Sequence, residues 1–317
     1  MSNAAPAVIA TYTRSGFTEG VHIGHVVVVD PAGAVVRSWG DPDHVIFPRS
    51  ANKPAQATAM VRHELDLPVH LLALSASSHS GERMHLAGVR EILASAGLDE
   101  SALQTPPDYP LDPWERDAWI GEGRRAVPIA MNCSGKHAAM LATCVINDWP
   151  TKTYRDPAHP LQQGIRWQIE ALAGEPVQQV GIDGCGAPVM SLTLTGLARS
   201  LSRAVQEEPD SPARRVTSAM VAFPDFVGGS NRDVTAFMRA IPGLVAKDGA
   251  EGVYVAALPD GTGIAIKSED GSDRARQVAL AAVLVGLGAD ADALASLLSI
   301  PLSGGGAVVG EVSSPLG

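Results

Sequence analysis

Residues 21–40 read VHIGHVVVVDPAGAVVRSWG, two valine-rich runs on either side of Asp30-Pro31-Ala32-Gly33. β-Branched side chains favour strands, and proline and glycine at these positions favour a turn. The segment therefore predicts a β-hairpin. A second hairpin is predicted in EGVYVAALPDGTGIAIKSEDG (residues 251–271), which has Pro259-Asp260-Gly261 at its turn.

The chain between these hairpins is mainly helical in composition, over roughly residues 80–225. Strands at both ends and helices between them favour an α/β (α+β) protein. In such a fold the terminal hairpins pair into a central, mainly antiparallel sheet, and the helices pack around it. We expect residues 1–317 to form a single domain. The sequence has no regular βαβα alternation and no GxGxxG or GxxxxGK[ST] motif, which argues against a nucleotide-binding fold.

Composition narrows the class of protein. Of the 317 residues, 45% are hydrophobic and 18% are charged, which is typical of a globular chain with a large core. A net charge of −10 argues against nucleic acid and anionic membranes as partners, because both attract basic surfaces. No apolar run reaches membrane-spanning length, and the first residues lack the pattern of an export signal. With three cysteines, we expect reduced thiols and a cytoplasmic location.

The segment FPRSANKPAQA (residues 47–57) holds Ser50 and Lys53 three positions apart. Proline is tolerated only near the start of a helix, so Pro54 predicts a helix that begins close to Ser50. Side chains at positions i and i+3 share one face of a helix, and a buried lysine can activate a serine nucleophile. The other interpretation is a capping serine beside a solvated lysine.

Lysine is scarce, since only five of the 24 basic residues are lysine and the others are arginine. A buried lysine can lose its proton, whereas arginine cannot, so each lysine is a candidate for chemistry. Lys267 ends a predicted strand in IAIKSEDG. It either joins the serine, like the third motif of SxxK hydrolases, or is an exposed lysine at a strand end.

Three polar segments are further candidates. SASSHSGE (residues 75–82) follows an apolar run that reads as a strand, and it is either a site loop or a helix-capping loop. NCSGKHAAM and GIDGCGAP contribute Cys133, Lys136 and Cys185. Two thiolates with a nitrogen or oxygen ligand can hold zinc in a tetrahedral site. The spacing is not that of a zinc finger, and packed thiols are the alternative.

Six segments follow one another in a set order: RSANKPAQA, ASSHSGE, NCSGKHAAML, GIDGCGAP, KDGAEGVYVAAL and GIAIKSEDG. In this set and order the chain resembles the rhizobial-type (class 3) L-asparaginases, a family similar in fold to serine-dependent glutaminases and serine β-lactamases. The resemblance runs from about Ala7 to Gly310. It implies hydrolysis of the small molecule L-asparagine to L-aspartate and ammonia through an acyl-enzyme, by a homodimer.

The resemblance also implies two serine–lysine tandems. It pairs Ser50, as the nucleophile, with Lys53, and it pairs Ser78 with Lys267. Ser80, two residues further on, is a rival for Ser78 in the second tandem.

A zinc ion is implied beside the serines, with Cys133, Lys136 and Cys185 as its ligands. The candidates for substrate binding are Arg49, His79, Ser80, Asp183 and His137. Of these, Arg49 could meet the α-carboxylate of the substrate. Asp183 would hold the substrate ammonium or a ligand water.

Other functions stay open at this point. A glutaminase or a β-lactam-recognising serine hydrolase would use similar motifs, although Lys267-Ser268-Glu269 lacks the glycine of K-[ST]-G. A non-catalytic zinc-binding protein would account for the cysteines but not for the spacing of Ser50 and Lys53. Residues 104–128 match no motif of the family.

Overall fold

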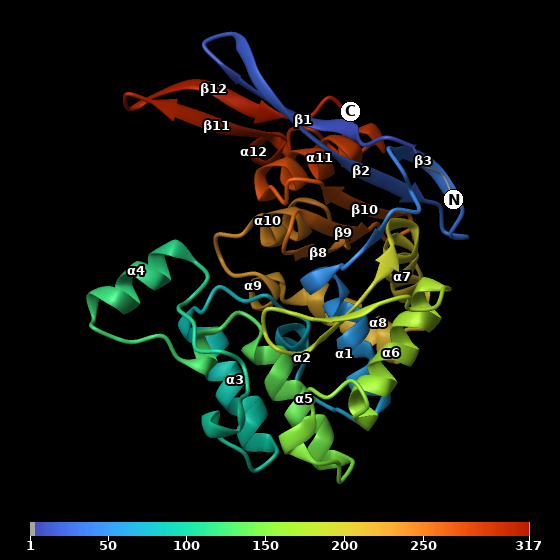
Figure 1. Ribbon diagram of the computed structural model, residues 1–317, viewed down its shortest axis with the longest axis vertical. Coiled ribbons are helices and arrows are strands. Elements are labelled where there is room, and N and C mark those ends of the chain that lie inside the picture. The colour runs from blue at the N-terminus through green and yellow to red at the C-terminus, as the bar shows by residue number, and fades with distance from the viewer. Residues whose placement is uncertain (1–3, 317) are drawn as a thin grey trace.

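The computed structural model describes residues 4–316, which form an eight-stranded sheet with helices on both faces (Figure 1). The strands of this sheet are β1 (Ala7–Arg14), β2 (Phe17–Val29), β3 (Val35–Trp39), β8 (Val245–Gly249), β9 (Val253–Ala257), β10 (Gly263–Ser268), β11 (Ser299–Gly304) and β12 (Ala307–Ser313). Two small sheets pair β4 (Val45–Ile46) with β7 (Leu192–Thr193) and β5 (Val180–Ile182) with β6 (Pro188–Met190).

Helices fill the middle of the chain and recur near its end. The α-helices are α1 (Lys53–Arg62), α2 (Val69–Ser75), α3 (Arg83–Ser95), α4 (Pro113–Gly121), α5 (Ser134–Ile146), α6 (Pro160–Ala173), α7 (Leu194–Gln206), α8 (Pro212–Ala222), α9 (Pro224–Val227), α10 (Asp233–Ala240), α11 (Asp273–Gly286) and α12 (Ala295–Leu298). The 3-10 turns are η1 (Arg49–Asn52), η2 (Glu100–Ala102), η3 (Pro128–Ala130) and η4 (Thr151–Thr153).

The order of strands confirms the predicted pairing of the two ends of the chain. The sheet runs β11-β12-β1-β2-β10-β9-β8, with β3 paired to β2, and its ladders are antiparallel. Strand β2 joins β10 in a register that sets Val27 opposite Ala265. Both predicted hairpins are present, as β2–β3 and β9–β10. The fold is therefore the expected α/β (α+β) arrangement around a central antiparallel sheet.

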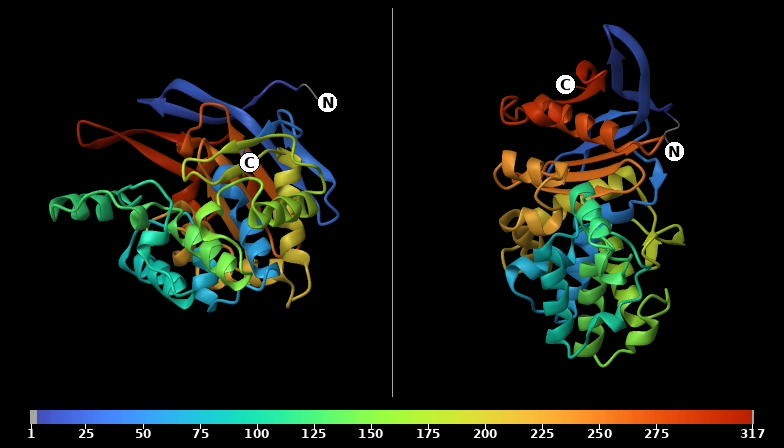
Figure 2. Two further views of the ribbon diagram at one scale, coloured as in Figure 1. Left: turned by 60° about the horizontal axis from the view of Figure 1, so that its bottom comes forward. Right: turned by 90° about the vertical axis from the view of Figure 1, so that its left-hand side faces the viewer.

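Helices cover the two faces of the sheet unequally. Helix α11 packs on one face, against β1, β10 and β12, and α7 packs on the other, against β2, β9 and β10. Behind α7 lies the helical body, in which α1 is enclosed by α5, α6 and α8 (Figure 2). Residues 51–61 are buried because helices surround α1 on several sides. The start of this enclosed helix is where the sequence places Ser50 and Lys53.

One local prediction is wrong. The apolar run before Ser75 forms helix α2 and not a strand. A run of this length has no clear period, so apolar composition alone does not separate a buried helix from a buried strand. The helical part of the chain ends later than the predicted residue 225, because α10 extends it to Ala240, and it includes the helix predicted to begin close to Ser50.

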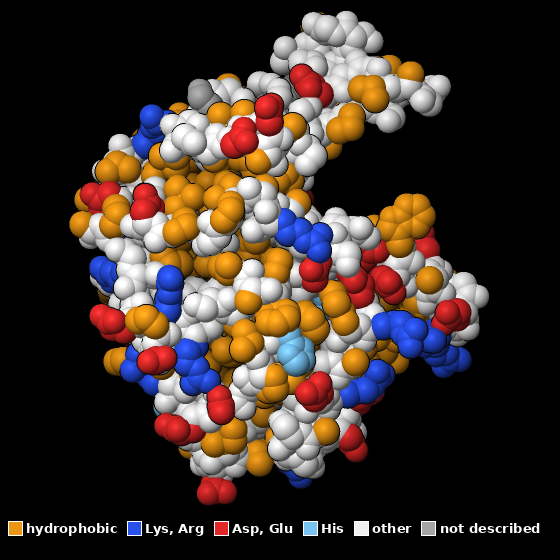
Figure 3. All heavy atoms as spheres, turned by 180° about the vertical axis from the view of Figure 1, so that it is seen from behind, with side chains coloured by type: hydrophobic (Ala, Val, Ile, Leu, Met, Phe, Trp, Pro, Cys, Tyr) orange, Lys and Arg blue, Asp and Glu red, His pale blue; other side chains and the backbone are white. Residues whose placement is uncertain are grey.

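Two hairpins extend beyond the body of the molecule, β1–β2 and β11–β12, and leave a recess beneath them (Figures 1 and 3). Their apolar tip residues Phe17 and Val308 are largely exposed. Among residues 4–316, no helix combines the length and hydrophobicity that crossing a bilayer requires.

The turn η1 connects the sheet to the helical body. Arg49, just before Ser50, has a φ of 53°, a left-handed backbone that costs a non-glycine residue of the order of 1–3 kcal/mol. Strand β8 lies against this turn, and a Cβ on Gly249 would come within 2.6 Å of Pro48 O and 3.2 Å of the Ala51 nitrogen. Only glycine lets β8 approach the backbone around Ser50 this closely.

We expect Gly249→Ala to push β8 away from η1 and to destabilise the protein by roughly 1–3 kcal/mol, the usual effect of overpacking. Chemical denaturation of the two proteins measures this difference. Gly121→Ala is the control, because nothing lies within 4 Å of its added Cβ at the end of α4. Equal stability of Gly249→Ala and wild type would contradict the close approach.

Candidate active site

The buried amine of Lys53 connects two of the predicted motifs. Lys53 is the first residue of α1, and its Nζ donates hydrogen bonds to Ser78 Oγ at 3.0 Å and to the carbonyl oxygen of Ser77 at 2.5 Å. Both acceptors lie in the loop after α2, so the helix start and this loop are joined at one amine. Among the described residues Ser50 makes no side-chain hydrogen bond, and it is partly exposed, whereas Ser78 is buried.

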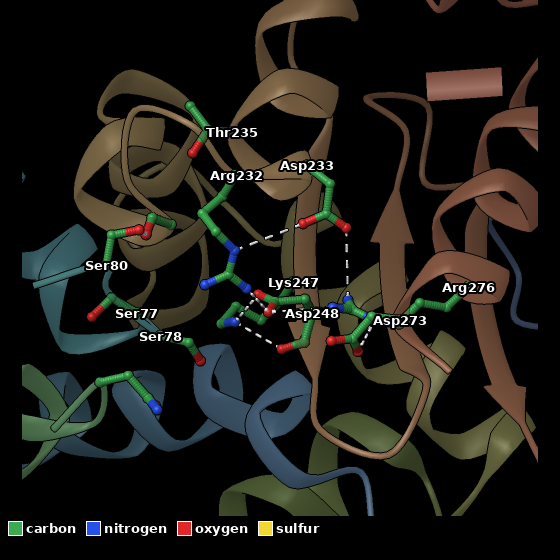
Figure 4. Close-up of polar contacts among 12 residues, drawn as sticks. Ser77, Ser78, Ser80, Arg232, Asp233, Thr235, Lys247, Asp248, Asp273 and Arg276 are labelled. Atoms are coloured by element: carbon green, nitrogen blue, oxygen red, sulfur yellow. Dashed lines mark hydrogen bonds and ion pairs between the residues drawn. The ribbon is translucent and has the colours of Figure 1, made fainter. Parts of the chain in front are cut away.

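A second buried lysine, Lys247, lies beside Lys53 and was missed by sequence reasoning. Lys247 is on β8 and is fully buried. Its Nζ donates to the Asp248 carboxylate and, at 2.7 Å, to the Asp248 carbonyl oxygen. Burial lowers the pKa of Lys247 to about 8; Lys53 and Arg232 act in the same direction, and Asp248 opposes them. In Figure 4 the Lys247 amine points toward the loop that carries Ser77 and Ser78.

Lys267 is placed differently from its predicted role. It lies on β10 between His25 of β2 and Val253 of β9, and its Nζ donates to the carbonyl oxygen of Ser268. In the described part of the chain no hydrogen bond joins Lys267 to Ser78. The structure therefore does not form the predicted second tandem, because Ser78 bonds to Lys53 and the lysine that approaches this pair is Lys247.

A signal for Lys247 was present in the sequence. Lys247-Asp248-Gly249 has a glycine in third position, as K-[ST]-G does, whereas Lys267-Ser268-Glu269 does not. Asp248 in second position obscured the match.

The three predicted metal ligands lie together. Cys133 immediately precedes α5, Lys136 is in its first turn, and Cys185 is in the turn between β5 and β6. All three are buried, and Lys136 Nζ lies 3.4 Å from Cys185 Sγ. The Cys133 thiol donates to Asn132 Oδ1 at 3.1 Å, and its interaction with Cys185 lowers the pKa of Cys185 and raises that of Cys133. Burial would lower the pKa of Lys136, but the two sulfurs raise it overall.

This donor set fits a zinc ion. With Zn–S near 2.3 Å and Zn–N near 2.05 Å, the nitrogen–sulfur edge of a tetrahedron is about 3.6 Å, close to the observed Lys136–Cys185 separation. Both thiols would have to ionise and Lys136 would have to be neutral.

A second group, His25, His44 and Glu269, has ligand atoms within 4.8 Å of one another. It is a poor metal site, because the Asp41 N–H donates to His25 Nδ1 at 2.8 Å. In neutral His25 the ring proton is therefore on Nε2, 3.2 Å from a Glu269 oxygen, and Nε2 has no free lone pair for a metal.

Charged side chains lie between the serines and the cysteines. Arg49 Nε pairs with Asp183 Oδ1 at 2.7 Å, and Arg49 Nη1 lies 3.7 Å from Glu251. Burial would raise the pKa of Asp183, but Lys136 and Arg49 lower it overall. Both predicted substrate ligands are thus present, and they form an ion pair with each other.

The remaining candidates are buried and hold neighbouring segments in place. His79 Nε2 lies 2.8 Å from Ser134 Oγ, His137 Nδ1 lies 2.6 Å from the Tyr154 hydroxyl, and the Ser80 hydroxyl donates to the carbonyl oxygen of Gly228 at 2.8 Å. Burial lowers the pKa of both histidines well below the usual range, so they are neutral. Among the described residues His137 Nε2 and His79 Nδ1 have no hydrogen-bond partner.

Comparison with family models places the chain among amidohydrolases of the asparaginase/glutaminase type. The model that matches is described as L-asparaginase II and covers residues 10–314, so the chain belongs to this family.

Several solved structures resemble the fold distantly. A β-lactamase from Mycobacterium bovis is 15% identical, with a TM-score of 0.47 over 83% of this chain and 94% of that one. Mglu in its native form is 16% identical, with a TM-score of 0.42 over 81% of this chain and 62% of that one. A Bacillus glutaminase is 13% identical, with a TM-score of 0.41 over 79% and 84%. Likenesses this distant support no argument about activity. No curated protein sequence matches the chain.

The depressed pKa of Lys247 predicts how its charge affects stability. Between pH 8 and about 10.4, the ordinary lysine value, the unfolded chain binds a proton that folded Lys247 has lost. Stability should therefore rise with pH in this window, by up to about 3 kcal/mol. Urea denaturation at several pH values should show this rise for wild type and a smaller one for Lys247→Met. Parallel pH dependences of the two proteins would contradict the depressed pKa.

Proposed function

We propose that this protein is an L-asparaginase that hydrolyses L-asparagine to L-aspartate and ammonia through an acyl-enzyme. The observation that carries the proposal is the Lys53 hydrogen bond to Ser78 at the buried start of α1, with the buried Lys247 beside it. Two buried amines beside Ser78, one of them from Lys53 and so close to Ser50 in the chain, would supply the proton transfers that amide hydrolysis requires. Family membership supports the choice of an amide as the substrate.

Ser50 is the better candidate for the nucleophile. It is partly exposed, so a substrate can reach it, whereas Ser78 is buried and bonded to Lys53. Strained backbone precedes Ser50 at Arg49, as is common where a side chain is held in position for chemistry. Ser78 then holds the Lys53 amine in place by accepting its hydrogen bond.

The proposed reaction has two halves. Ser50 Oγ attacks the carbon of the substrate side-chain amide while Lys53 accepts the hydroxyl proton, and backbone N–H groups at the start of η1 and α1 stabilise the oxyanion. The tetrahedral intermediate collapses, the C–N bond breaks, and the proton passes to the leaving nitrogen as ammonia. Water then attacks the ester carbonyl carbon while a lysine amine accepts its proton; the bond from this carbon to Ser50 Oγ breaks, the proton passes to Ser50 Oγ, and aspartate leaves.

The Arg49–Asp183 ion pair suits an amino-acid substrate. Such a substrate carries a carboxylate and an ammonium. The substrate carboxylate can bind Arg49 in place of Asp183, and the substrate ammonium can bind Asp183 in place of Arg49. This exchange keeps both protein charges paired before and after binding. It favours a free amino acid over a neutral amide.

Ammonia release from asparagine, glutamine and small β-aspartyl amides tests the function directly. We expect asparagine to be the best substrate. Ser50→Ala should lower kcat by at least about 10³-fold, since loss of a nucleophile commonly costs more than this. Wild-type turnover in Ser50→Ala would contradict the assignment.

Lys247 and Lys267, the two lysines on strands of the large sheet, provide a matched pair of variants. Lys247→Met should lower kcat by at least about 100-fold, because general acid–base groups contribute roughly 10²–10⁴. Lys267→Met should retain activity within a few-fold, since its amine is bonded to Ser268. The opposite result would restore the Ser78–Lys267 tandem implied by the sequence.

Zinc is a second part of the proposal. Cys133, Lys136 and Cys185 would hold the ion, which when bound would supply a positive charge near Asp183. Elemental analysis of purified protein should give about one zinc per chain. The content should fall in Cys133→Ser and Cys185→Ser but not in Cys144→Ser, a buried cysteine in the apolar core. Equal zinc in the three variants would contradict the site. The homodimer and the cytoplasmic location stay predictions.

A further inference from the structure

A cluster of charged side chains lies behind Lys247, between β8 and the helices α10 and α11 (Figure 4). Asp248 is at its centre. The cluster also contains Arg232, Asp233, Tyr254 and Arg276. Asp248 and Tyr254 lie in the motif KDGAEGVYVAAL. Arg232, Asp233 and Arg276 belong to none of the motifs that define the family resemblance.

The Asp248 carboxylate bridges the cluster and the site. Its Oδ1 accepts from the Lys247 amine, and its Oδ2 faces Arg232 Nη2 at 2.6 Å and Arg276 Nη2 at 3.8 Å. One oxygen of Asp248 therefore binds the lysine of the site, and the second oxygen faces two arginines. Burial would raise the pKa of Asp248, but Lys247, Arg232 and Arg276 hold it far below the usual range.

Arg276 is itself fixed from several directions. Its Nη1 lies 3.8 Å from Asp233 Oδ2, its Nε donates to Asp273 Oδ1 at 2.9 Å, and its guanidinium lies 4.9 Å from the centre of the Tyr254 ring. The side chain is buried, although Asp273 is largely exposed. A guanidinium held at this many points is a rigid anchor for the carboxylate that it faces.

A protonated Lys247 amine would share its carboxylate with other cations. Arg232 and Arg276 are permanent cations, Asp248 and Asp233 are anions within the cluster, and the exposed carboxylate of Asp273 also pairs with Arg276. Lys53 adds a further amine from α1. Asp248, the carboxylate that Lys247 contacts, also faces both arginines, so a proton on Lys247 adds a buried charge whose anion is shared with two other cations.

We propose that Arg276 and Arg232 are positioning residues of the site: they fix Asp248, which holds the Lys247 amine beside Lys53 and Ser78, and by occupying this carboxylate they leave the amine able to accept a proton. This inference rests on the proposed function for the role of Lys247 as a base. Arg276 acts through Asp248, since among residues 4–316 its ion pairs and its ring contact are with members of the cluster and with Asp273.

The pH dependence of kcat/KM for ammonia release tests the arrangement. Asp248→Asn removes the anion beside Lys247, so the acid limb of the profile should move to lower pH by about one unit or more. Arg276→Met removes a competing cation and leaves Asp248 freer to stabilise protonated Lys247, so the limb should move to higher pH by roughly one unit. Arg276→Lys, which keeps the cation, should lie nearer wild type.

Arg239→Met is the matched control. Arg239 is an exposed arginine on α10 that pairs with Asp225, away from the cluster. Its pH profile should coincide with that of wild type. If Arg276 has a purely structural role, Arg276→Met lowers activity but leaves the acid limb of the pH profile where it is in wild type. Such a result would contradict the positioning role.

A direct titration separates this inference from the proposed function. The chain has only five lysines, so NMR of ¹³C-labelled lysine Cε gives few signals, and Lys247→Met identifies the one of interest. The Lys247 titration should move to lower pH in Asp248→Asn and to higher pH in Arg276→Met. Should wild type release no ammonia from any amide, the proposed function fails, while this titration still supports or overturns the positioning role. An unmoved midpoint, or a shift in one common direction, in folded variants would overturn it.

Discussion

The burial of lysine amines is the constraint on which this structure depends. Lys53, Lys136 and Lys247 are all buried, and a buried charge without a partner is costly. Each amine has a different partner. Lys53 donates hydrogen bonds to the loop of Ser77 and Ser78. Lys136 faces Cys185 Sγ, and Lys247 donates to Asp248. Removing one partner of a buried pair typically costs about 3–5 kcal/mol.

These partners come from elements that lie far apart in the sequence. The loop after α2, the turn between β5 and β6, and strand β8 must all reach the buried ends of α1 and α5. The pairing of β2 with β10 makes this possible, because it fixes the C-terminal strands against the N-terminal ones and so places β8 next to η1. The sheet thus serves the site by holding β8 where Gly249 allows close contact with the turn before α1.

Much of the fold followed from the sequence. Valine-rich runs around proline and glycine turns predicted both hairpins, and their positions at the two ends of the chain predicted the sheet. Pro54 predicted the start of α1, and the sequence of motifs brought Cys133, Lys136 and Cys185 together correctly. The failure at α2 reflects an apolar run too short to show a helical period.

What the sequence did not show is the pairing of distant charges. Nothing in local spacing indicates that Arg276, on α11, meets Asp248 on β8, and only the glycine of Lys247-Asp248-Gly249 hinted that Lys247 and not Lys267 approaches Lys53. Lys267 and Lys247 are both on strands of one sheet, and only the packing of β8 against η1 separates their roles. Such contacts depend on tertiary packing, which periodicity does not encode.

The division between arginine and lysine gains a physical meaning from the charge cluster. Arginine keeps its proton under all ordinary conditions, so Arg232 and Arg276 give Asp248 a fixed environment. A lysine in place of Arg232 or Arg276 could itself lose a proton, and the charge next to Asp248 would then change in the pH range in which Lys247 titrates. A chain that uses arginine for most of its cations can therefore keep proton exchange for a few amines, and three of its five lysines are buried around this site.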